Sequence, residues 1–292
     1  MQNLLDGKTL AVIGDPVAHS LSPLIQQAML DELGWRCTYG RIHVPGGTVA
    51  AWLPGAAASG LAGFNATMPH KTDLVPLMDT LSEDARLYRS VNTVVIRDGA
   101  FHGFNTDGEG FLRSLLDEGI TPEGRRAAVF GAGGAARSVV LKLARTGAEH
   151  VTVCCRTPEK AAALTENAPD ISVTDMAPDT LAQVLRSADL FINCTPLGME
   201  GVNADFADFS FLDALPKTAP VCDVIYRPLC TALLHEAARR GHLAVNGLGM
   251  LIHQAILALE HFSGEPLDAA AMKSAILKKL LPALQSEVRP QH

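Results

Sequence analysis

The chain has 292 residues, of which 48% are hydrophobic, so it is long enough to bury the cores of two domains. It carries 31 acidic and 24 basic residues, a net charge of −7, and no basic run stands out along it. This balance argues against a nucleic-acid or anionic-membrane surface and favours a small-molecule ligand.

The start of the sequence and its cysteines indicate a cytoplasmic protein. The first apolar run, Thr9–Gly14, is too short for a signal-peptide core or a membrane span. The six cysteines show neither the paired spacing of a zinc site nor a small disulfide framework. We therefore expect no metal site and reduced packing cysteines at Cys37, Cys154, Cys155, Cys194, Cys222 and Cys230.

The first third of the chain has the pattern of an α/β unit. Strand-like runs at Thr9–Gly14, Thr38–Val44 and Leu61–Thr67 are separated by segments with helical spacing. Two further runs, Asn92–Arg97 and Ala100–Phe104, flank an Asp-Gly dipeptide that accepts the positive φ angles of a tight hairpin turn. A hairpin is therefore expected to complete the first sheet.

The first helix has recognisable ends. Ser22-Pro23 opens it as N-cap and first-turn proline, and Gly34 stands where a C-terminal glycine belongs.

A second α/β lobe is expected from Arg126 onward. Strand-like runs at 127–130 and 151–155 enclose a glycine loop and a helix to about Thr146, and further strands are expected at 190–193 and 221–225. Two helical stretches, about 249–262 and 267–284, end the chain.

The glycine loop has the context of a dinucleotide-binding motif. It follows an apolar strand and precedes a helix, so its small residues let a pyrophosphate approach the amides at the helix N-terminus. Glycine turns also serve packing, but this placement favours a nucleotide. The residues concerned are Gly131, Ala132, Gly133, Gly134 and Ala135.

The end of the second strand of this lobe favours NADP over NAD. An NAD site usually has an acidic residue there, whereas this strand ends Cys154-Cys155-Arg156-Thr157. Arg156 can hold a 2′-phosphate, Thr157 can donate a hydroxyl bond and Lys160 could add charge. The alternative is that Arg156 is a solvated residue at a strand end.

Three polar clusters stand at the ends of apolar runs in the first lobe, where an open α/β sheet places its ligands. They offer hydroxyls, amides, one amine and one carboxylate, which suits a polyhydroxylated anion. The clusters are Ser20–Ser22, Asn65–Lys71, and Asn92-Thr93 with Asn105–Asp107.

These motifs, in this order and spacing, resemble the shikimate dehydrogenase family over almost the whole chain. The resemblance implies an N-terminal substrate-binding α/β domain (1–107), a Rossmann-like NADP-binding domain (108–248), and final helices (249–292) that return to the first domain. The segments that carry it are Ile13–Pro23, Asn65–Lys71, Val91–Thr93, Asn105–Gly108, Gly131–Ala135, Asn193–Met199 and Gly247–Gln254.

The resemblance also implies roles for single residues in the reduction of 3-dehydroshikimate to shikimate, a step of aromatic amino-acid synthesis. Lys71 and Asp107 are expected to flank the reacting oxygen as a proton-handling pair, and either could transfer the proton. The ring carboxylate is expected on Ser20 and Ser22, the other ring oxygens on Thr67, Asn92 and Gln254, Tyr226 near the nicotinamide and substrate, and Gly247 at the cofactor.

Each of these residues also has an ordinary structural reading. Lys71 could be a solvated lysine in a helical first turn, Asp107 could cap the helix that follows it, and Tyr226 could be a core aromatic residue. Ser22 is expected to serve both as helix cap and as carboxylate ligand. Asn65 could equally be a turn or strand-end residue.

Two other functions fit the pattern. A quinate or aminoshikimate dehydrogenase using NAD or NADP would share the same pair, although the two serines favour shikimate. A non-catalytic metabolite sensor would be expected to lose Lys71 or Asp107, and both are present. The sequence is compatible with a monomer or a homodimer.

Overall fold

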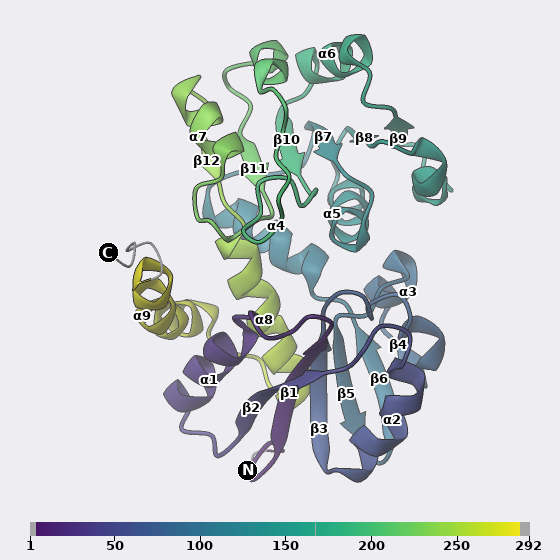
Figure 1. Cartoon of the computed structure of the whole chain (residues 1–292), viewed down its shortest axis with the longest axis vertical. Helices are drawn as coiled ribbons and strands as arrows, with labels where there is room; N and C mark the ends of the chain where they lie inside the picture. Colours follow the sequence, from purple (N-terminus) through teal and green to yellow (C-terminus); the bar gives the residue numbers. More distant parts are fainter. Residues whose placement is uncertain (1–3, 167, 287–292) are drawn as a thin grey trace. The chain divides into compact units, whose positions relative to one another are not determined.

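The structure is a computed structural model that describes residues 4–166 and 168–286. Its described residues form two compact units (Figure 1). The first runs to Thr106 and resumes at Ile252, and the second comprises Asp107–Leu251. A two-domain α/β fold was predicted, and the structure confirms it.

The first unit is built on a six-stranded mixed sheet. β1, β2 and β3 are parallel, β5 runs antiparallel to β3, and β6 runs antiparallel to β5, in the order β2-β1-β3-β5-β6-β4. The strands are β1 (Thr9–Gly14), β2 (Thr38–His43), β3 (Leu61–Ala66), β4 (Thr80–Leu81), β5 (Thr93–Arg97) and β6 (Ala100–Phe104).

The hairpin between β5 and β6 forms as predicted. Asp98 and Gly99 both have positive φ, 53° and 79°, which is the backbone that a two-residue hairpin turn requires. Glycine adopts this region without steric cost, and aspartate is among the side chains that tolerate it.

Helices cover both faces of this sheet (Figure 1). On one face, Trp52 of α2 packs edge-on against Phe64 of β3, with ring centroids 5.1 Å apart. The helices of the first unit are α1 (Ser22–Glu32), α2 (Val49–Ala58), α3 (Glu83–Tyr88), the greater part of α8 (Leu248–Ser263) and α9 (Ala269–Ser286), with a 3-10 turn at Val75–Leu77.

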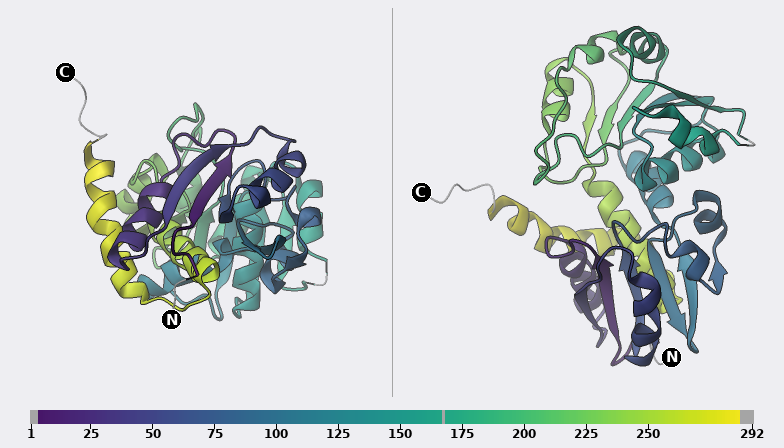
Figure 2. Two further views of the ribbon diagram at one scale, coloured as in Figure 1. Left: turned by 90° about the horizontal axis from the view of Figure 1, so that it is seen from below. Right: turned by 45° about the vertical axis from the view of Figure 1, so that its right-hand side comes forward.

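The last two helices return to this unit, as predicted. Gln26 of α1 donates to the carbonyl of Ala255 on α8 at 3.0 Å, and Phe262 packs so closely on Gly63 of β3 that a Cβ there would lie 2.7 Å from its ring. α9 lies beside α1 (Figure 2), where Lys279 pairs with Asp31 at 2.5 Å.

The predicted start of the first helix was partly wrong. Gly34 has the expected positive φ of 65°. The N-cap position, however, belongs to Leu21, whose backbone is already near-helical, and Ser22 is the first helical residue without a capping bond. Its hydroxyl therefore does not cap the helix amides and instead meets Ser20.

The second unit is a parallel sheet of order β12-β11-β10-β7-β8-β9, with all its pairings parallel. Its strands are β7 (Arg126–Phe130), β8 (His150–Cys154), β9 (Ile171–Thr174), β10 (Leu190–Asn193), β11 (Val221–Asp223) and β12 (Ala244–Val245). Its helices are α4 (Asp107–Asp117), α5 (Gly134–Arg145), α6 (Pro178–Arg186) and α7 (Ala232–Arg239), with 3-10 turns at Pro158–Leu164 and Ser210–Ala214.

Within the described part of the chain, no helix has both the length and the apolar character that crossing a membrane requires.

Candidate functional site

The predicted polar clusters of the first unit gather at one edge of its sheet. The register pairs Ile13 with Ala66, Asn65 with Thr93, and Thr93 with Phe104. The ends of β1, β3 and β6 and the start of β5 therefore share an edge, and the loops that leave it carry the polar residues. This is where an open α/β sheet places its ligands.

The two serines lie together in the loop after β1. The Ser20 hydroxyl donates to the Ser22 hydroxyl at 3.2 Å, and the backbone N–H of Ser22 donates to Ser20 Oγ at 3.3 Å. Arg41 holds the loop from outside by donating to the carbonyl of Ser20 at 2.7 Å. Two half-buried hydroxyls beside the N-terminus of α1 are well placed to bind an anion.

Asp15 fixes the first half of the same loop. It accepts from the backbone N–H of Gly46 at 3.0 Å and pairs with His43 Nε2 at 2.9 Å. The bond from His43 holds the pKa of the Asp15 carboxyl below its usual value. The side chain is exposed, so we assign it a loop-positioning role.

Asn92 and Asn65 are tied into buried networks. Asn92 is 2% exposed, and its Oδ1 accepts from the backbone N–H of Thr106 and from the Thr93 hydroxyl, both at 2.9 Å. Asn65 accepts from the Tyr39 hydroxyl at 2.7 Å and donates to Thr93 Oγ1 at 2.9 Å. Asn65 is thus a structural residue, and Tyr39, which the sequence did not single out, belongs to the same network.

Lys71 lies in a series of turns after β3, so the alternative of a helical first-turn lysine is wrong. Its backbone carbonyl accepts from the N–H of Val91 at 2.8 Å, which ties this loop to the start of β5. Asp107 is 5% exposed and is the first residue of α4, in the second unit. Because the two residues belong to different units, their pairing remains a prediction.

The remaining substrate-site candidates lie on separate elements. Thr67 follows β3 and donates its N–H to the carbonyl of Ile13 at 3.0 Å. A Cβ on Gly14 would lie 2.4 Å from the Thr67 methyl group, so glycine is required there. Gln254 is half-buried on α8 in the first unit, whereas Tyr226 is half-buried in the second, where burial raises the pKa of its hydroxyl.

The glycine loop of the second unit fits a pyrophosphate. Gly131 has a φ of 102°, and a Cβ on it would lie 3.1 Å from the carbonyl oxygen of Cys194. A Cβ on Gly133 or Gly134 would meet nothing within 4 Å, so the space before α5 is open. The loop thus leaves room beside amides at a helix N-terminus.

Arg156 and Thr157 are exposed after the end of β8, and no carboxylate stands among the four residues from Cys154 to Thr157. Glu159 follows in the next turn and is exposed. A guanidinium and a hydroxyl at this point suit a 2′-phosphate. The side chain of Lys160 lies outside the described residues.

A buried carboxylate that the sequence did not single out organises the ends of β10 and β11. Asp223, 2% exposed, accepts from Asn193 Nδ2 at 3.0 Å, from Thr231 Oγ1 at 2.8 Å and from the N–H of Ile225 at 3.1 Å. Asn193 in turn accepts from the Thr195 hydroxyl at 2.6 Å. Burial raises the pKa of Asp223 to about 6.

Gly247 is required by close packing. A Cβ on it would lie 2.1 Å from the carbonyl oxygen of Val224, and its N–H donates to Ile225 at 2.9 Å. The glycine therefore keeps the segment before α8 against the loop after β11. A role at the cofactor remains a prediction.

The cysteines follow the prediction in part. All six cysteines are unpaired; Cys37, Cys154, Cys155 and Cys222 are buried, whereas Cys194 is half-buried and Cys230 is exposed. Three histidines lie in the segments that carry the family resemblance: His70 and His253 are buried, and His19 is exposed. Among residues 4–166 and 168–286, no group of histidine, cysteine and acidic side chains could hold a metal ion.

Three family models match the chain. They are the shikimate dehydrogenase substrate binding domain over residues 12–94, shikimate/quinate 5-dehydrogenase over 117–199, and the shikimate 5′-dehydrogenase C-terminal domain over 247–277. A shikimate dehydrogenase (NADP(+)) from Alkaliphilus metalliredigens is 41% identical over 278 residues, which cover 93% of this chain and 97% of the relative.

Solved structures of shikimate and quinate dehydrogenases are also similar to this chain. A shikimate dehydrogenase in complex with NADP+ matches with a TM-score of 0.84 at 33% identity, over 95% of this chain and 98% of its own. A quinate dehydrogenase from Corynebacterium glutamicum in complex with NAD matches with a TM-score of 0.83 at 30% identity, over 93% and 99%.

The fold and the glycine loop define a two-domain α/β protein whose second unit has room for a dinucleotide. Its similarity to the curated relatives over nearly the whole length goes further: the chain belongs to the shikimate dehydrogenase family.

Proposed function

We propose that this protein catalyses the reversible NADP-dependent reduction of 3-dehydroshikimate to shikimate. The observation that carries the proposal is the Ser20–Ser22 hydroxyl pair at the sheet edge from which the Lys71 loop also leaves. A carboxylate on the serines would bring a small ring acid to the edge that carries the lysine.

Residues 1–107 would bind the substrate, 108–248 would bind NADP, and the helices of 249–292 would complete the substrate domain. Gly131–Ala135 would hold the pyrophosphate through backbone amides, and Arg156, Thr157 and Lys160 would hold the 2′-phosphate. Gly247 would border the same site. NADPH supplies the hydride when bound.

The chain's own residues would orient the ring and handle the proton. Ser20 and Ser22 would bind the carboxylate, and Thr67, Asn92, Gln254 and Tyr226 would contact the remaining oxygens or border them. Because Asn92 is almost fully buried, its largest contribution would be to hold Thr106.

Lys71, as an ammonium, would donate a proton to the ketone oxygen as negative charge develops on it, and would take the proton back in the oxidation direction. The Asp107 carboxylate would hold the lysine and stabilise its charge. Neither residue alone would be sufficient, since an unheld ammonium on a flexible stem loses orientation.

Quinate is the second candidate substrate, because a quinate dehydrogenase is among the similar structures. Steady-state kinetics with shikimate or quinate, each with NADP or NAD, separate the two functions. We expect shikimate with NADP to give a kcat/KM at least about 10²-fold above either quinate combination. A preference for quinate would contradict the proposal. No turnover with any combination of substrate and cofactor would also contradict it and would indicate a metabolite sensor.

A further inference from the structure

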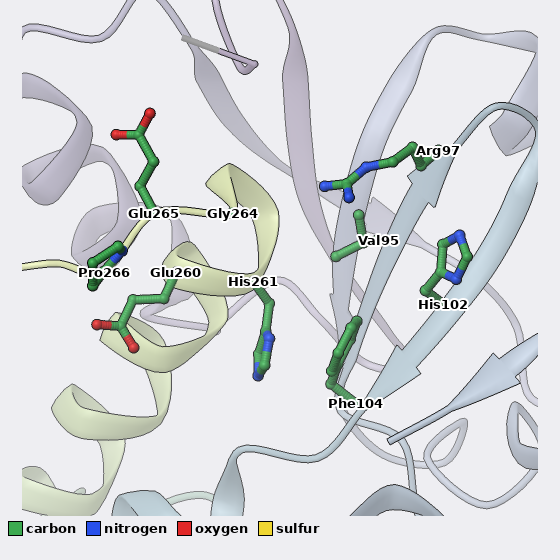
Figure 3. Close-up of a pocket in the computed structure, with 9 residues that line it drawn as sticks. All are labelled: Val95, Arg97, His102, Phe104, Glu260, His261, Gly264, Glu265 and Pro266. Atoms are coloured by element: carbon green, nitrogen blue, oxygen red, sulfur yellow. The ribbon is translucent and has the colours of Figure 1, made fainter. Parts of the chain in front are cut away.

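A pocket of about 480 Å³ lies in the first unit, between the β5–β6 hairpin and the end of α8 (Figure 3). β5 begins at the site edge with Thr93 and ends at Arg97, so the pocket extends away from the serines and the Lys71 loop. Its volume is within the range of about 300–1,000 Å³ that ligand pockets occupy.

The pocket floor is one face of the β5–β6 hairpin. The register pairs Val95 with His102 and Thr93 with Phe104, and residues two apart on a strand share a face, so Val95, Arg97, His102 and Phe104 lie on one face. α8 ends at Ser263, and the turn after it, residues 264–266, lines the pocket together with these strand residues. An apolar floor thus lies beside a basic side chain.

The pocket wall is held in place by hydrogen bonds of its own. Glu260 Oε1 accepts from the N–H of Leu267 at 2.9 Å, and Ser263 Oγ accepts from the N–H of Glu265 at 3.2 Å. His261 stacks on Phe104 with ring centroids 4.0 Å apart and 21° between the planes. His102 is anchored to Thr80 at 2.8 Å. The flat surfaces are therefore preformed.

Arg97 ends β5 with an exposed side chain, and the contacts above do not involve it. Within the described part of the chain its guanidinium makes no hydrogen bond or ion pair, and it points toward the turn after α8, where its Nη2 is 4.0 Å from a Cβ built on Gly264 (Figure 3). The carboxylates of Glu260 and Glu265 point away from the strands in the same view. Glu260 and Glu265 also line the pocket, so Arg97 provides positive charge on the strand side only.

We propose that this pocket binds a small flat monocarboxylate, with its carboxylate on the Arg97 fork and its ring on Val95 and the Phe104–His261 stack. A guanidinium matches a carboxylate with two parallel N–H bonds, and ring faces favour a flat partner. Burial lowers the pKa of His261, so the stacked ring is neutral near pH 7 and Arg97 supplies the full charge.

The test uses benzoate as the probe, titrated into the full chain and followed by two-dimensional amide NMR. We expect shifts in the β5–β6 hairpin and residues 260–266 that persist when Ser22 is replaced, with a Kd on the order of 0.1–1 mM for so small a ligand. Acetate, which lacks the ring, and benzamide, which lacks the charge, should each bind at least about 10-fold more weakly.

Substitutions at Arg97 and elsewhere test where benzoate binds. Arg97→Ala should weaken benzoate binding at least about 10-fold, whereas the exposed Arg186→Ala, far from the hairpin in sequence and in the other unit, should not change it. Ser22→Ala should also leave it unchanged, because the serine site is separate. Unchanged binding in Arg97→Ala, loss in Ser22→Ala, or equal binding of acetate or benzamide would each overturn the proposal.

Discussion

The backbone N–H of Thr106 donates a 2.9 Å hydrogen bond to Oδ1 of Asn92, and Asn92 Nδ2 donates to the Thr106 hydroxyl at the same distance. A side chain before β5 thereby fixes the segment after β6. The next residue along the chain is Asp107. Asn92 therefore fixes the backbone of the residue that immediately precedes this carboxylate.

Replacing Asn92 should affect both stability and turnover. Asn92→Ala leaves the buried Thr106 N–H without its acceptor, which should lower the free energy of unfolding by about 1–3 kcal/mol. It should also lower kcat more than it raises KM. Asn92→Asp, which keeps an acceptor at the same place, should unfold closer to wild type. Equal losses in the two variants would show that the hydrogen bond to Thr106 is not what matters.

The serine pair should control substrate affinity. Ser20→Ala and Ser22→Ala each remove a hydroxyl donor to the carboxylate, and a bond to a charged group contributes about 1.5–3 kcal/mol, so KM for shikimate should rise about 10-fold or more. Ser59→Ala, which removes a hydroxyl bonded to the carbonyl of Ala56, is the matched control. Unchanged KM in both serine variants would place the carboxylate elsewhere.

Arg156 should determine the choice of cofactor. Arg156→Ala should raise KM for NADP about 10- to 100-fold and leave KM for NAD nearly unchanged, because only NADP carries the 2′-phosphate. Steady-state kinetics with both cofactors measure the ratio, with Arg186→Ala as control. A parallel change for the two cofactors would mean that Arg156 does not contact the phosphate.

The buried Asp223 should make stability depend on pH. Its pKa is raised from 3.8 to about 6 by burial, so the folded chain holds this proton more tightly than the unfolded chain does. The stabilising contribution of Asp223 to the free energy of unfolding is fully present below about pH 4 and is lost as the pH rises through about 6.

Asp223→Asn cannot titrate, so it serves as the reference. Between about pH 5 and about pH 7.5, wild type should lose about 1–2 kcal/mol relative to this variant in denaturant unfolding. The lost carboxylate hydrogen bonds should add an offset that does not vary with pH. If the free energies of unfolding of wild type and Asp223→Asn changed in parallel with pH, the raised pKa of Asp223 would be contradicted.

Local signals in the sequence predicted local structure well. Asp98-Gly99 and Gly34 adopt the positive φ angles that their residue types favour, and the runs 9–14 and 190–193 are strands with the expected ends. The predicted N-cap at Ser22 failed because capping depends on the backbone of the preceding residue, and Leu21 is already near-helical.

Edge strands and contacts between residues on different strands were harder to predict from the sequence. The edge strand β12 has only two residues. The other edge strand, β9, is as long as β10 but has one buried residue where β10 has four, so it shows no apolar run. Asp223 meets Asn193 and Thr231 only once β10 and β11 are paired, and no spacing along the chain encodes that contact. The pocket at Arg97 likewise depends on where α8 ends relative to the hairpin.

The pair Lys71 and Asp107 is the centre of the proposed chemistry, and a double-mutant cycle tests it most directly. Lys71→Ala and Asp107→Ala should each lower kcat by about 10²- to 10⁴-fold with smaller changes in KM, and the double variant should lose little more than the worse single variant. Thermal unfolding of each variant checks its fold. Near-wild-type turnover in folded Lys71→Ala, or losses that multiply in the double variant, would contradict a coupled pair.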